Sequence, residues 1–398
     1  HVKTEKLEQA EAAARDALLR VLTDFGLRNV DLENIEGVRI RPRQRKPLQR
    51  VLKSFFKKHG ETEIAGKVRA LLQNQNNEPD VDTAPEPDIE QPRQPPIAGP
   101  VLVNPNEVDQ NKWRRKTADL KIALQQANRS AHRNIWNNMQ FRPTKKGEIG
   151  MISMHIDGVA DLSALDNLNS LVQVELQAWR QENVKISNLS FLKDKPVRVL
   201  VCRRCKLRSL RDLQTLPLHR LDIAENSVSD LSPLRGMHLT DLNVSKNPLR
   251  SIAALADMPL QTLRINHTKV DEMSVVKTLP HLQHLEASHS SIHTLKNLND
   301  KKIRHLAVAG TKVGNLEPLL GTALQYLDVS DTEIDVFDAL AKLPLQSLIV
   351  SDTSYSDIES LRGLPLTTFG ANNTGLTSID ALAGKEIHRL LIGGTDIS

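Results

Sequence analysis

Two stretches of sequence decide the fold: Leu218-His-Arg-Leu221-Asp-Ile223-Ala-Glu-Asn226-Ser-Val228 and Leu239-Thr-Asp-Leu242-Asn-Val244-Ser-Lys-Asn247-Pro-Leu249. Every apolar position of the first recurs in the second after 21 residues. A fixed period of this length indicates a repeat architecture, in which each unit buries its apolar positions against its neighbours. The sequence therefore predicts an array of stacked units.

The motif begins twelve times along the chain. Eight of the eleven spacings are 21 residues, two are 22, and one is 26 because residues 181–185 are inserted. The first positions are Ile149, Leu171, Val197, Leu218, Leu239, Leu260, Leu282, Ile303, Leu324, Leu345, Leu366 and Ile387. Each repeat also has a second half, such as Asp230-Leu231-Ser232-Pro233-Leu234. Because 21 residues leave too little chain for a strand and a long helix, we expect these halves to form short 3₁₀ turns.

The pattern L-x-x-L-x-L-x-x-N/C-x-L resembles that of leucine-rich repeat proteins, and over residues 149–398 it is similar to the internalin-like class of short repeats. Similar arrays, with Thr in place of the ladder Asn, occur in large bacterial signalling proteins. The resemblance implies an α+β solenoid: a leucine-rich-repeat horseshoe with a parallel concave sheet and short 3₁₀ convex turns. It also implies a bacterial protein that binds other proteins.

The ninth motif position follows the strand and carries a polar side chain, which we expect to satisfy buried backbone groups of the turn. We call this column the ladder. Its members from the fourth repeat onward are Asn226, Asn247, Thr268, Ser290, Thr311, Thr332, Thr353, Thr374 and Thr395. A hydroxyl both donates and accepts, so Thr is expected to serve as Asn does. The same register places Cys202 at an inward strand position and Cys205 in the ladder, which favours structural thiols over a zinc or redox pair.

Composition divides the rest of the chain into three parts. Residues 1–73 carry apolar side chains at helical spacing and predict a small, basic, mostly helical unit. Residues 74–110 lose this periodicity and hold eight prolines between Pro79 and Pro105, which predicts a linker of polyproline II character. Residues 111–148 return to a helical pattern, with a helix ending near Met139, and are expected to cap the repeat domain of residues 149–398.

One segment is strongly basic. Between Gly37 and Gly60 there are nine Lys or Arg residues and no Asp or Glu. These nine residues are Arg39, Arg41, Arg43, Arg45, Lys46, Arg50, Lys53, Lys57 and Lys58. They suit contact with a nucleic acid or an acidic membrane, or else form the solvated face of the helical unit. The net charge of +5 is too small to decide between these alternatives.

The outward strand positions of the repeats form the candidate partner-binding face, because alternate strand residues point to opposite faces of a sheet. We assign partner binding to Asp222, Asn243, Arg264, Glu286, Asp328, Ile349 and Leu391, with Tyr326 as an aromatic anchor. A solvated sheet without a partner is the alternative. Two histidine pairs, His284 with His305 and His267 with His289, fall at matching positions of adjacent repeats, where they are either exposed or share a metal or pH-sensitive site.

No catalytic motif is visible: the sequence lacks a P-loop, G-x-S-x-G, H-E-x-x-H and a dinucleotide-binding glycine pattern. We therefore expect a protein-binding scaffold without an enzyme activity, a cofactor or a metal. A polyanion adaptor and the regulatory part of a longer signalling enzyme are the alternatives. No secretory signal is seen, so the cytoplasm is the default expectation, although a chain that begins at His1 leaves a leader or upstream domain open.

The last repeat carries Ile387, Leu390 and Ile392 at inward positions. Repeat proteins usually need a terminal cap with a polar outer face. We therefore expect the C-terminal edge to contact a second copy of the chain or another subunit.

Overall fold

The computed structural model describes Ala14, Leu18 and residues 99–397, except 132, 180–183, 185, 187, 300 and 301. The chain divides into two compact units, residues 1–97 and 98–398. In the first unit, Ala14 and Leu18 are helical and buried. The remaining predicted helices of residues 1–73, the basic segment and residues 74–98 of the predicted linker lie outside the described residues, so those predictions stand untested.

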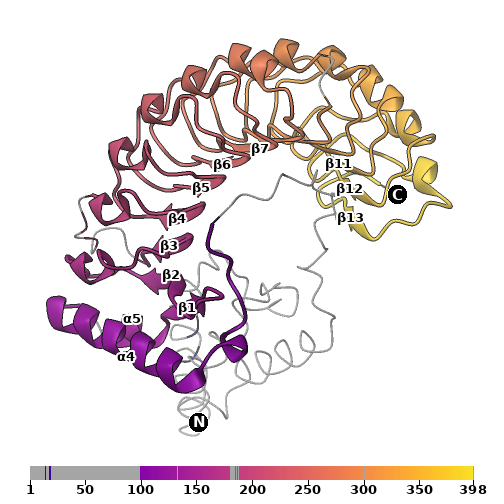
Figure 1. The fold of residues 1–398 in the computed structure, drawn as a ribbon. Coiled ribbons are helices and arrows are strands. Elements are labelled where there is room, and N and C mark those ends of the chain that lie inside the picture. The colour runs from indigo at the N-terminus through magenta and orange to yellow at the C-terminus, as the bar shows by residue number, and fades with distance from the viewer. Residues whose placement is uncertain are drawn as a thin grey trace, which may run out of the picture. The chain divides into compact units, whose positions relative to one another are not determined.

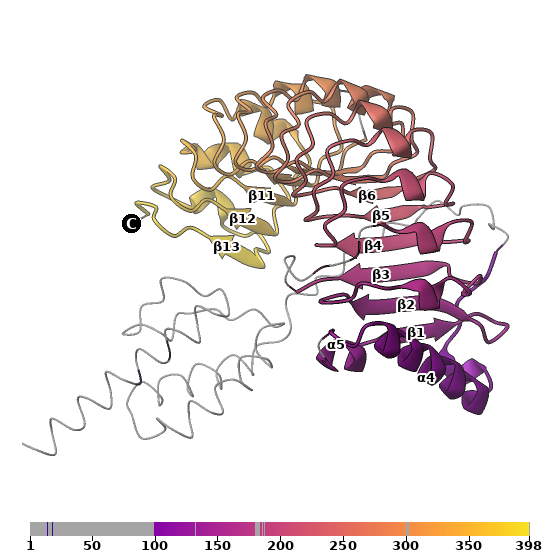
Figure 2. The ribbon, with the colours of Figure 1, turned by 90° about the vertical axis from the view of Figure 1, so that its left-hand side faces the viewer.

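The second unit is a leucine-rich-repeat solenoid. Its sheet contains thirteen strands in sequence order, and every pairing from β2 to β13 is parallel. The strands line the inner side of the curved unit, and the 3₁₀ turns form its outer side (Figures 1 and 2). The predicted leucine-rich-repeat fold, with its parallel concave sheet and short 3₁₀ convex turns, is therefore confirmed.

The bounds of the elements follow the motif. The strands are β1 (Gln140–Pro143), β2 (Ile149–His155), β3 (Gln173–Gln177), β4 (Val199–Arg203), β5 (Arg220–Asp222), β6 (Asp241–Asn243), β7 (Thr262–Arg264), β8 (His284–Glu286), β9 (His305–Ala307), β10 (Tyr326–Asp328), β11 (Ser347–Ile349), β12 (Thr368–Gly370) and β13 (Arg389–Leu391). The convex turns are η3 (Ser163–Leu165), η5 (Ser190–Leu192), η6 (Arg211–Leu213), η7 (Ser232–Leu234), η8 (Ala253–Leu255), η9 (Ser274–Thr278), η10 (Lys296–Leu298), η11 (Glu317–Leu319), η12 (Asp338–Lys342), η13 (Ile358–Leu361) and η14 (Asp380–Leu382).

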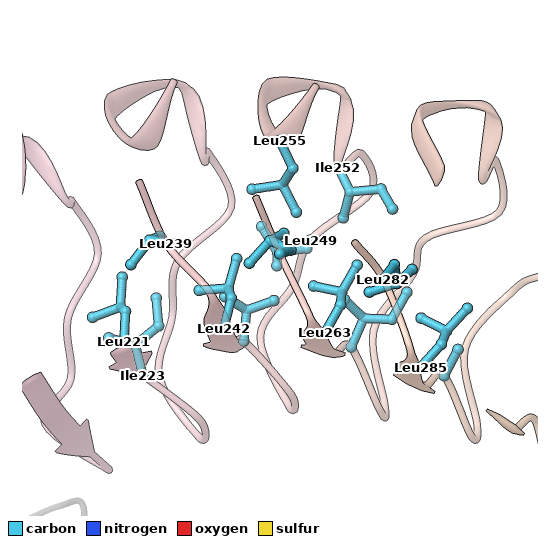
Figure 3. Packing of buried hydrophobic residues seen from close by; sticks show 14 of the residues in the cluster. Leu221, Ile223, Leu239, Leu242, Leu249, Ile252, Leu255, Leu263, Leu282 and Leu285 are labelled. Atoms are coloured by element: carbon cyan, nitrogen blue, oxygen red, sulfur yellow. The ribbon is translucent and has the colours of Figure 1, made fainter. Parts of the chain in front are cut away.

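Adjacent repeats pair without slippage, and this register builds the core. Leu221 lies beside Leu242, and Leu242 beside Leu263, in successive strands. These inward side chains are fully buried and pack between the sheet and the convex turns, together with residues such as Leu249 and Leu255 (Figure 3). Each fully buried Leu contributes about 1.5–3 kcal/mol relative to an exposed one, and here the burial depends on the neighbouring repeat.

The N-terminal cap differs from the single helix predicted up to Met139. Helix α4 (Gln110–Ala127) ends at Asn128, and a short helix α5 (Arg133–Asn137) follows. The buried Asn128 amide donates to Leu124 O at 2.9 Å and to Asp161 O at 2.7 Å. Its Oδ1 accepts from the backbone of Ala160 at 2.8 Å. This side chain therefore ends the helix and attaches it to the first repeat.

The cap also contains an unexpected strand. Residues 140–143 form β1, which pairs antiparallel with β2 and lies at the edge of the sheet. The end of the predicted linker joins this cap as well: Val103 donates to Pro143 O at 2.9 Å, and a short 3₁₀ turn, η2 (Pro105–Glu107), begins with the Asn104 side chain as its cap. Residues 101–109 therefore make specific contacts with the cap, including an isolated bridge between Leu102 and Thr144.

The ladder column works in two different ways. The Asn226 side chain accepts from Cys205 N and Leu207 N at 2.9 and 3.0 Å, and it donates to Cys202 O at 2.7 Å, so it joins its own repeat to the preceding one. The Thr311 hydroxyl instead donates at 2.6 Å to Val308 O, three residues earlier. Thr268, Ser290, Thr332, Thr353, Thr374 and Thr395 make the same local bond. The expectation that Thr replaces Asn fully is therefore wrong, because a hydroxyl is too short to reach the preceding repeat.

We predict that Asn226→Ala destabilises the protein more than Thr311→Val does. The first change leaves several buried backbone groups of two repeats without a hydrogen-bond partner and should cost on the order of 3 kcal/mol. The second removes one local bond and should cost about 1 kcal/mol. Chemical unfolding monitored by circular dichroism measures both values. Thr294→Val is the control, since Thr294 lies outside the ladder and accepts only from Lys296 N at 3.3 Å. Equal losses for Asn226→Ala and Thr311→Val would contradict the two modes.

Strand β13 is the open edge of the described sheet, and its Leu390 is 38% exposed, whereas Leu348 and Phe369 of the two preceding strands are fully buried. We predict that this edge self-associates, because unpaired strand edges and exposed apolar layers favour pairing. Light scattering over a concentration series should show association that Leu390→Glu abolishes. Val336→Glu, at an exposed position before η12, should not change it. A wild-type protein that stays monomeric at high concentration would contradict the prediction.

Candidate binding face of the solenoid

The concave face is built by the outward side chains of the short repeat strands. Seven of the eight predicted partner-binding residues are partly exposed there, and their positions are Asn243, Arg264, Glu286, Tyr326, Asp328, Ile349 and Leu391. The eighth, Asp222, is only 2% exposed. Its carboxylate accepts from Arg203 and from Asn243 Nδ2, so it serves as a structural acceptor between neighbouring repeats.

A charged network occupies the middle of this face. Arg264 lies between two carboxylates, with Nη1 3.1 Å from Asp241 Oδ1 and Nε 2.9 Å from Glu286 Oε1. Glu286 also accepts from Asn266 Nδ2 at 2.9 Å, and Arg220 Nε lies 3.5 Å from Asp241 Oδ2. The parallel register pairs Arg264 with Glu286 on β8, and Arg264 reaches Asp241 diagonally, since Asp241 lies two residues before its register partner Asn243 on β6. These partly exposed ion pairs orient one another but contribute little to stability.

An aromatic cluster follows on β9 and β10. The rings of His305 and Tyr326 stack with centroids 4.0 Å apart and an angle of 6° between planes, and His284 meets His305 edge-on at 5.7 Å. Burial lowers the pKa of His305 to about 4, with Glu286 opposing and His284 adding to the shift. Burial also raises the pKa of Tyr326 to about 12. Both rings are therefore uncharged near neutral pH.

An apolar surface continues this cluster toward the C-terminus. Gly370 lies between Ile349 and Leu391 in the register of β11 to β13. A Cβ at Gly370 would approach Ile349 Cδ1 to 3.0 Å and Leu391 Cδ1 to 3.7 Å, so these two side chains lie over the glycine. We call Tyr326, Ile349 and Leu391 the apolar pad. It is the part of the predicted face that a partner could cover without breaking an ion pair.

A further column borders the charged network at the eighth motif position, where the backbone has positive φ. Residues of this column include Lys246, His267, His289 and Gly310, with φ between 54° and 65°. The His267 and His289 rings stack at 4.5 Å, and Gly310 leaves the space that the His289 ring occupies. Burial, with His289 and Lys246, lowers the pKa of His267. The pair borders a shallow hollow of about 470 Å³, shared with Arg264 and Glu286.

The described residues contain no group of three or more His, Cys, Asp or Glu side chains that could hold a metal ion. Both thiols are free and buried: Cys205 Sγ lies 3.4 Å from Arg203 O, and burial raises the pKa of the Cys205 thiol, with the neighbouring Cys202 adding to the shift. Within the same residues, no helix combines the length and the hydropathy that crossing a bilayer requires. The basic residues from Arg39 to Lys58 lie outside the described part of the chain.

Sequence reasoning missed one aromatic residue. Trp179 occupies the ladder position of the second repeat, yet its side chain is 48% exposed and stacks on His155 with ring centroids 4.3 Å apart. The signal was present in the sequence: a Trp stands where the column elsewhere has Asp, Asn, Thr, Ser or Cys, just before the inserted residues 181–185. Trp179 is therefore a second accessible aromatic side chain, in addition to the predicted anchor Tyr326.

Comparison with known proteins supports the fold. No protein-family model and no curated protein matches the chain. Among solved structures, an internalin, InlF, from Listeria monocytogenes matches with a TM-score of 0.56 and 20% identity, over 71% of this chain and 90% of its own. The functional domain of InlJ, also from Listeria monocytogenes, matches with a TM-score of 0.41 and 17% identity, over 63% and 64% of the two chains. The chain thus has a leucine-rich-repeat fold of the internalin type.

The low pKa of His305 leads to a pH prediction. The native state keeps this imidazole neutral down to about pH 4, whereas the unfolded chain protonates it near pH 6.5. The unfolded state therefore binds more protons in this window, and stability falls as the pH drops from about 6.5 to 4. The contribution should be about 3 kcal/mol. Urea unfolding at pH 7 and near pH 4.5 should show a smaller loss for His305→Gln than for the wild type. The same loss in both proteins would rule out this role of His305.

Proposed function

We propose that the protein is a non-catalytic binding scaffold that holds a protein partner on its concave face. The observation that carries the proposal is the apolar pad of Tyr326, Ile349 and Leu391, which lies on β10, β11 and β13, on the C-terminal side of the charged network of β6 to β8. Interfaces commonly combine an apolar centre with polar surroundings, and a few aromatic or aliphatic anchors contribute most of the binding energy.

The side chains of this face are arranged before any partner arrives. Tyr326 is held by its stack on His305, and Arg264 is held by Asp241 and Glu286. Ordering of flexible side chains costs about 0.5–1.5 kcal/mol for each one that a partner immobilises. Preorganisation reduces this cost, so even a small apolar pad can support specific binding.

The charged network has a different role in the proposal. Its ion pairs are already satisfied within the protein, so a partner gains little affinity by replacing them. Charges beside an interface mainly set the orientation of the partner and exclude partners of unsuitable charge. We therefore assign affinity to the apolar pad, and orientation to Arg264 and Glu286 of the network and to Asp328, a separate carboxylate on β10.

The test places a photo-crosslinking amino acid at Ile349 on the pad and, as a matched control, at Val336, which is exposed beside the convex turn η12. We expect a discrete protein adduct from position 349 in extracts of the source cells and none from position 336. Once the partner is purified, Tyr326→Ala should weaken binding at least tenfold, which corresponds to about 1.4 kcal/mol.

Calorimetry with the purified partner decides the outcome. Lys296→Ala, in the convex turn η10, should leave the affinity unchanged. Adducts that form equally at both positions, or full affinity in Tyr326→Ala, would place the partner elsewhere and overturn the proposal.

A further inference from the structure

Trp179 departs from the pattern of the ladder position, where the other repeats carry a small polar or thiol side chain. At the ladder position, Cys205, Asn226 and Asn247 are buried and satisfy the turn, but the indole of Trp179 lies half exposed. It is the only aromatic among the large hydrophobic side chains that are exposed in the described part of the chain. Departures from local rules without a packing benefit are expected mainly at functional sites.

The indole is held in a fixed position. It stacks on His155 with an angle of 34° between the ring planes, and its backbone N–H donates to Asp157 Oδ2 at 2.9 Å. Burial lowers the pKa of His155, with Asp157 opposing the shift, so the supporting imidazole is neutral near pH 7. The two rings therefore form a rigid platform without formal charge.

A hollow of about 440 Å³ adjoins this platform, with His155 as part of its lining. It lies where the end of α5 meets β1, β2 and β3. Its polar side chains are all uncharged: Asn137, Asn138, Gln140, Ser153 and Gln177. Within the described structure these five make no side-chain hydrogen bond, and the Nδ1 atom of His155 is buried without a partner. The hydrogen-bonding capacity of the five polar side chains that line the hollow is thus unused.

This combination fits one chemical class of ligand. A carboxamide donates and accepts at once, as do the adjacent hydroxyl groups of a sugar. The flat face of an indole packs against the C–H face of a pyranose ring. A lining without charge gives phosphates, nucleic acids and acidic peptides no counter-ion, and the volume falls in the range of about 300–1,000 Å³ found for small-ligand sites. We propose that the Trp179–His155 platform and the adjoining hollow bind a neutral saccharide.

The test uses five defined probes: maltotriose, cellotriose, mannotriose, lactose and triacetylchitotriose. Binding is followed by saturation-transfer NMR and by tryptophan fluorescence, in which Trp179 dominates the response because Trp113 and Trp136 are buried. We expect at least one probe to bind with a dissociation constant in the millimolar range. Trp179→Ala and Gln177→Ala should each weaken that binding, the first at least tenfold, whereas Trp179→Tyr should retain it within about threefold.

Two controls make the result decisive. Each variant must show the wild-type unfolding midpoint, and Tyr326→Ala must bind the saccharide normally, since it tests the protein-binding proposal and not this one. Trigalacturonate, which carries negative charge, should bind more weakly than the neutral probe that binds best. Absence of binding by all five neutral probes, or binding that survives both Trp179→Ala and Gln177→Ala, would overturn the proposal. A protein partner that needs Trp179 while no saccharide binds would do the same.

Discussion

The structure depends on the burial of aliphatic side chains between successive repeats. A strand of three residues with one short turn cannot enclose a core of its own, and Leu242 is fully buried only because β5 and β7 lie on either side. The requirement repeats with every copy of the motif, so stability in such an array is shared between neighbours. It also explains why inward positions are almost uniformly aliphatic, while the outward positions of the same strands are free to vary.

Three surfaces arise from that freedom, and they differ in chemistry along the array. The Trp179–His155 platform lies at the N-terminal end, the ion pairs around Arg264 in the middle, and the apolar pad toward the C-terminal end. The ladder changes along the same direction, from Asn226 and Asn247, which join repeats, to Thr side chains that bond only within their own turn. In the later repeats the ladder therefore no longer joins neighbours, which are held together by packing and by backbone hydrogen bonds such as Val350 N to Gly370 O.

The sequence was sufficient to predict the period, the parallel strands, the 3₁₀ turns and the inward positions, because each is imposed again in every repeat. It was insufficient where a feature occurs once. The four residues of β1 carry no clear alternation, and nothing local indicates that Asn128 divides the cap into two helices. The burial of Asp222 depends on Arg203 and Asn243 of other repeats, which an outward register position does not reveal. Trp179 was visible in the sequence, and following the ladder back to the second repeat would have found it.

Hydrogen exchange at single-residue resolution tests the parallel stack most directly. Backbone amides that donate to the next repeat, such as Val244 to Arg264 O at 2.9 Å, Ile265 to Glu286 O at 2.8 Å and Val308 to Asp328 O at 2.8 Å, should exchange slowly. Their protection should recur at the 21- to 22-residue spacing of the motif, with fast exchange in the exposed loops between. Protection without that period, or slow exchange in only one isolated block of repeats, would contradict a continuous solenoid.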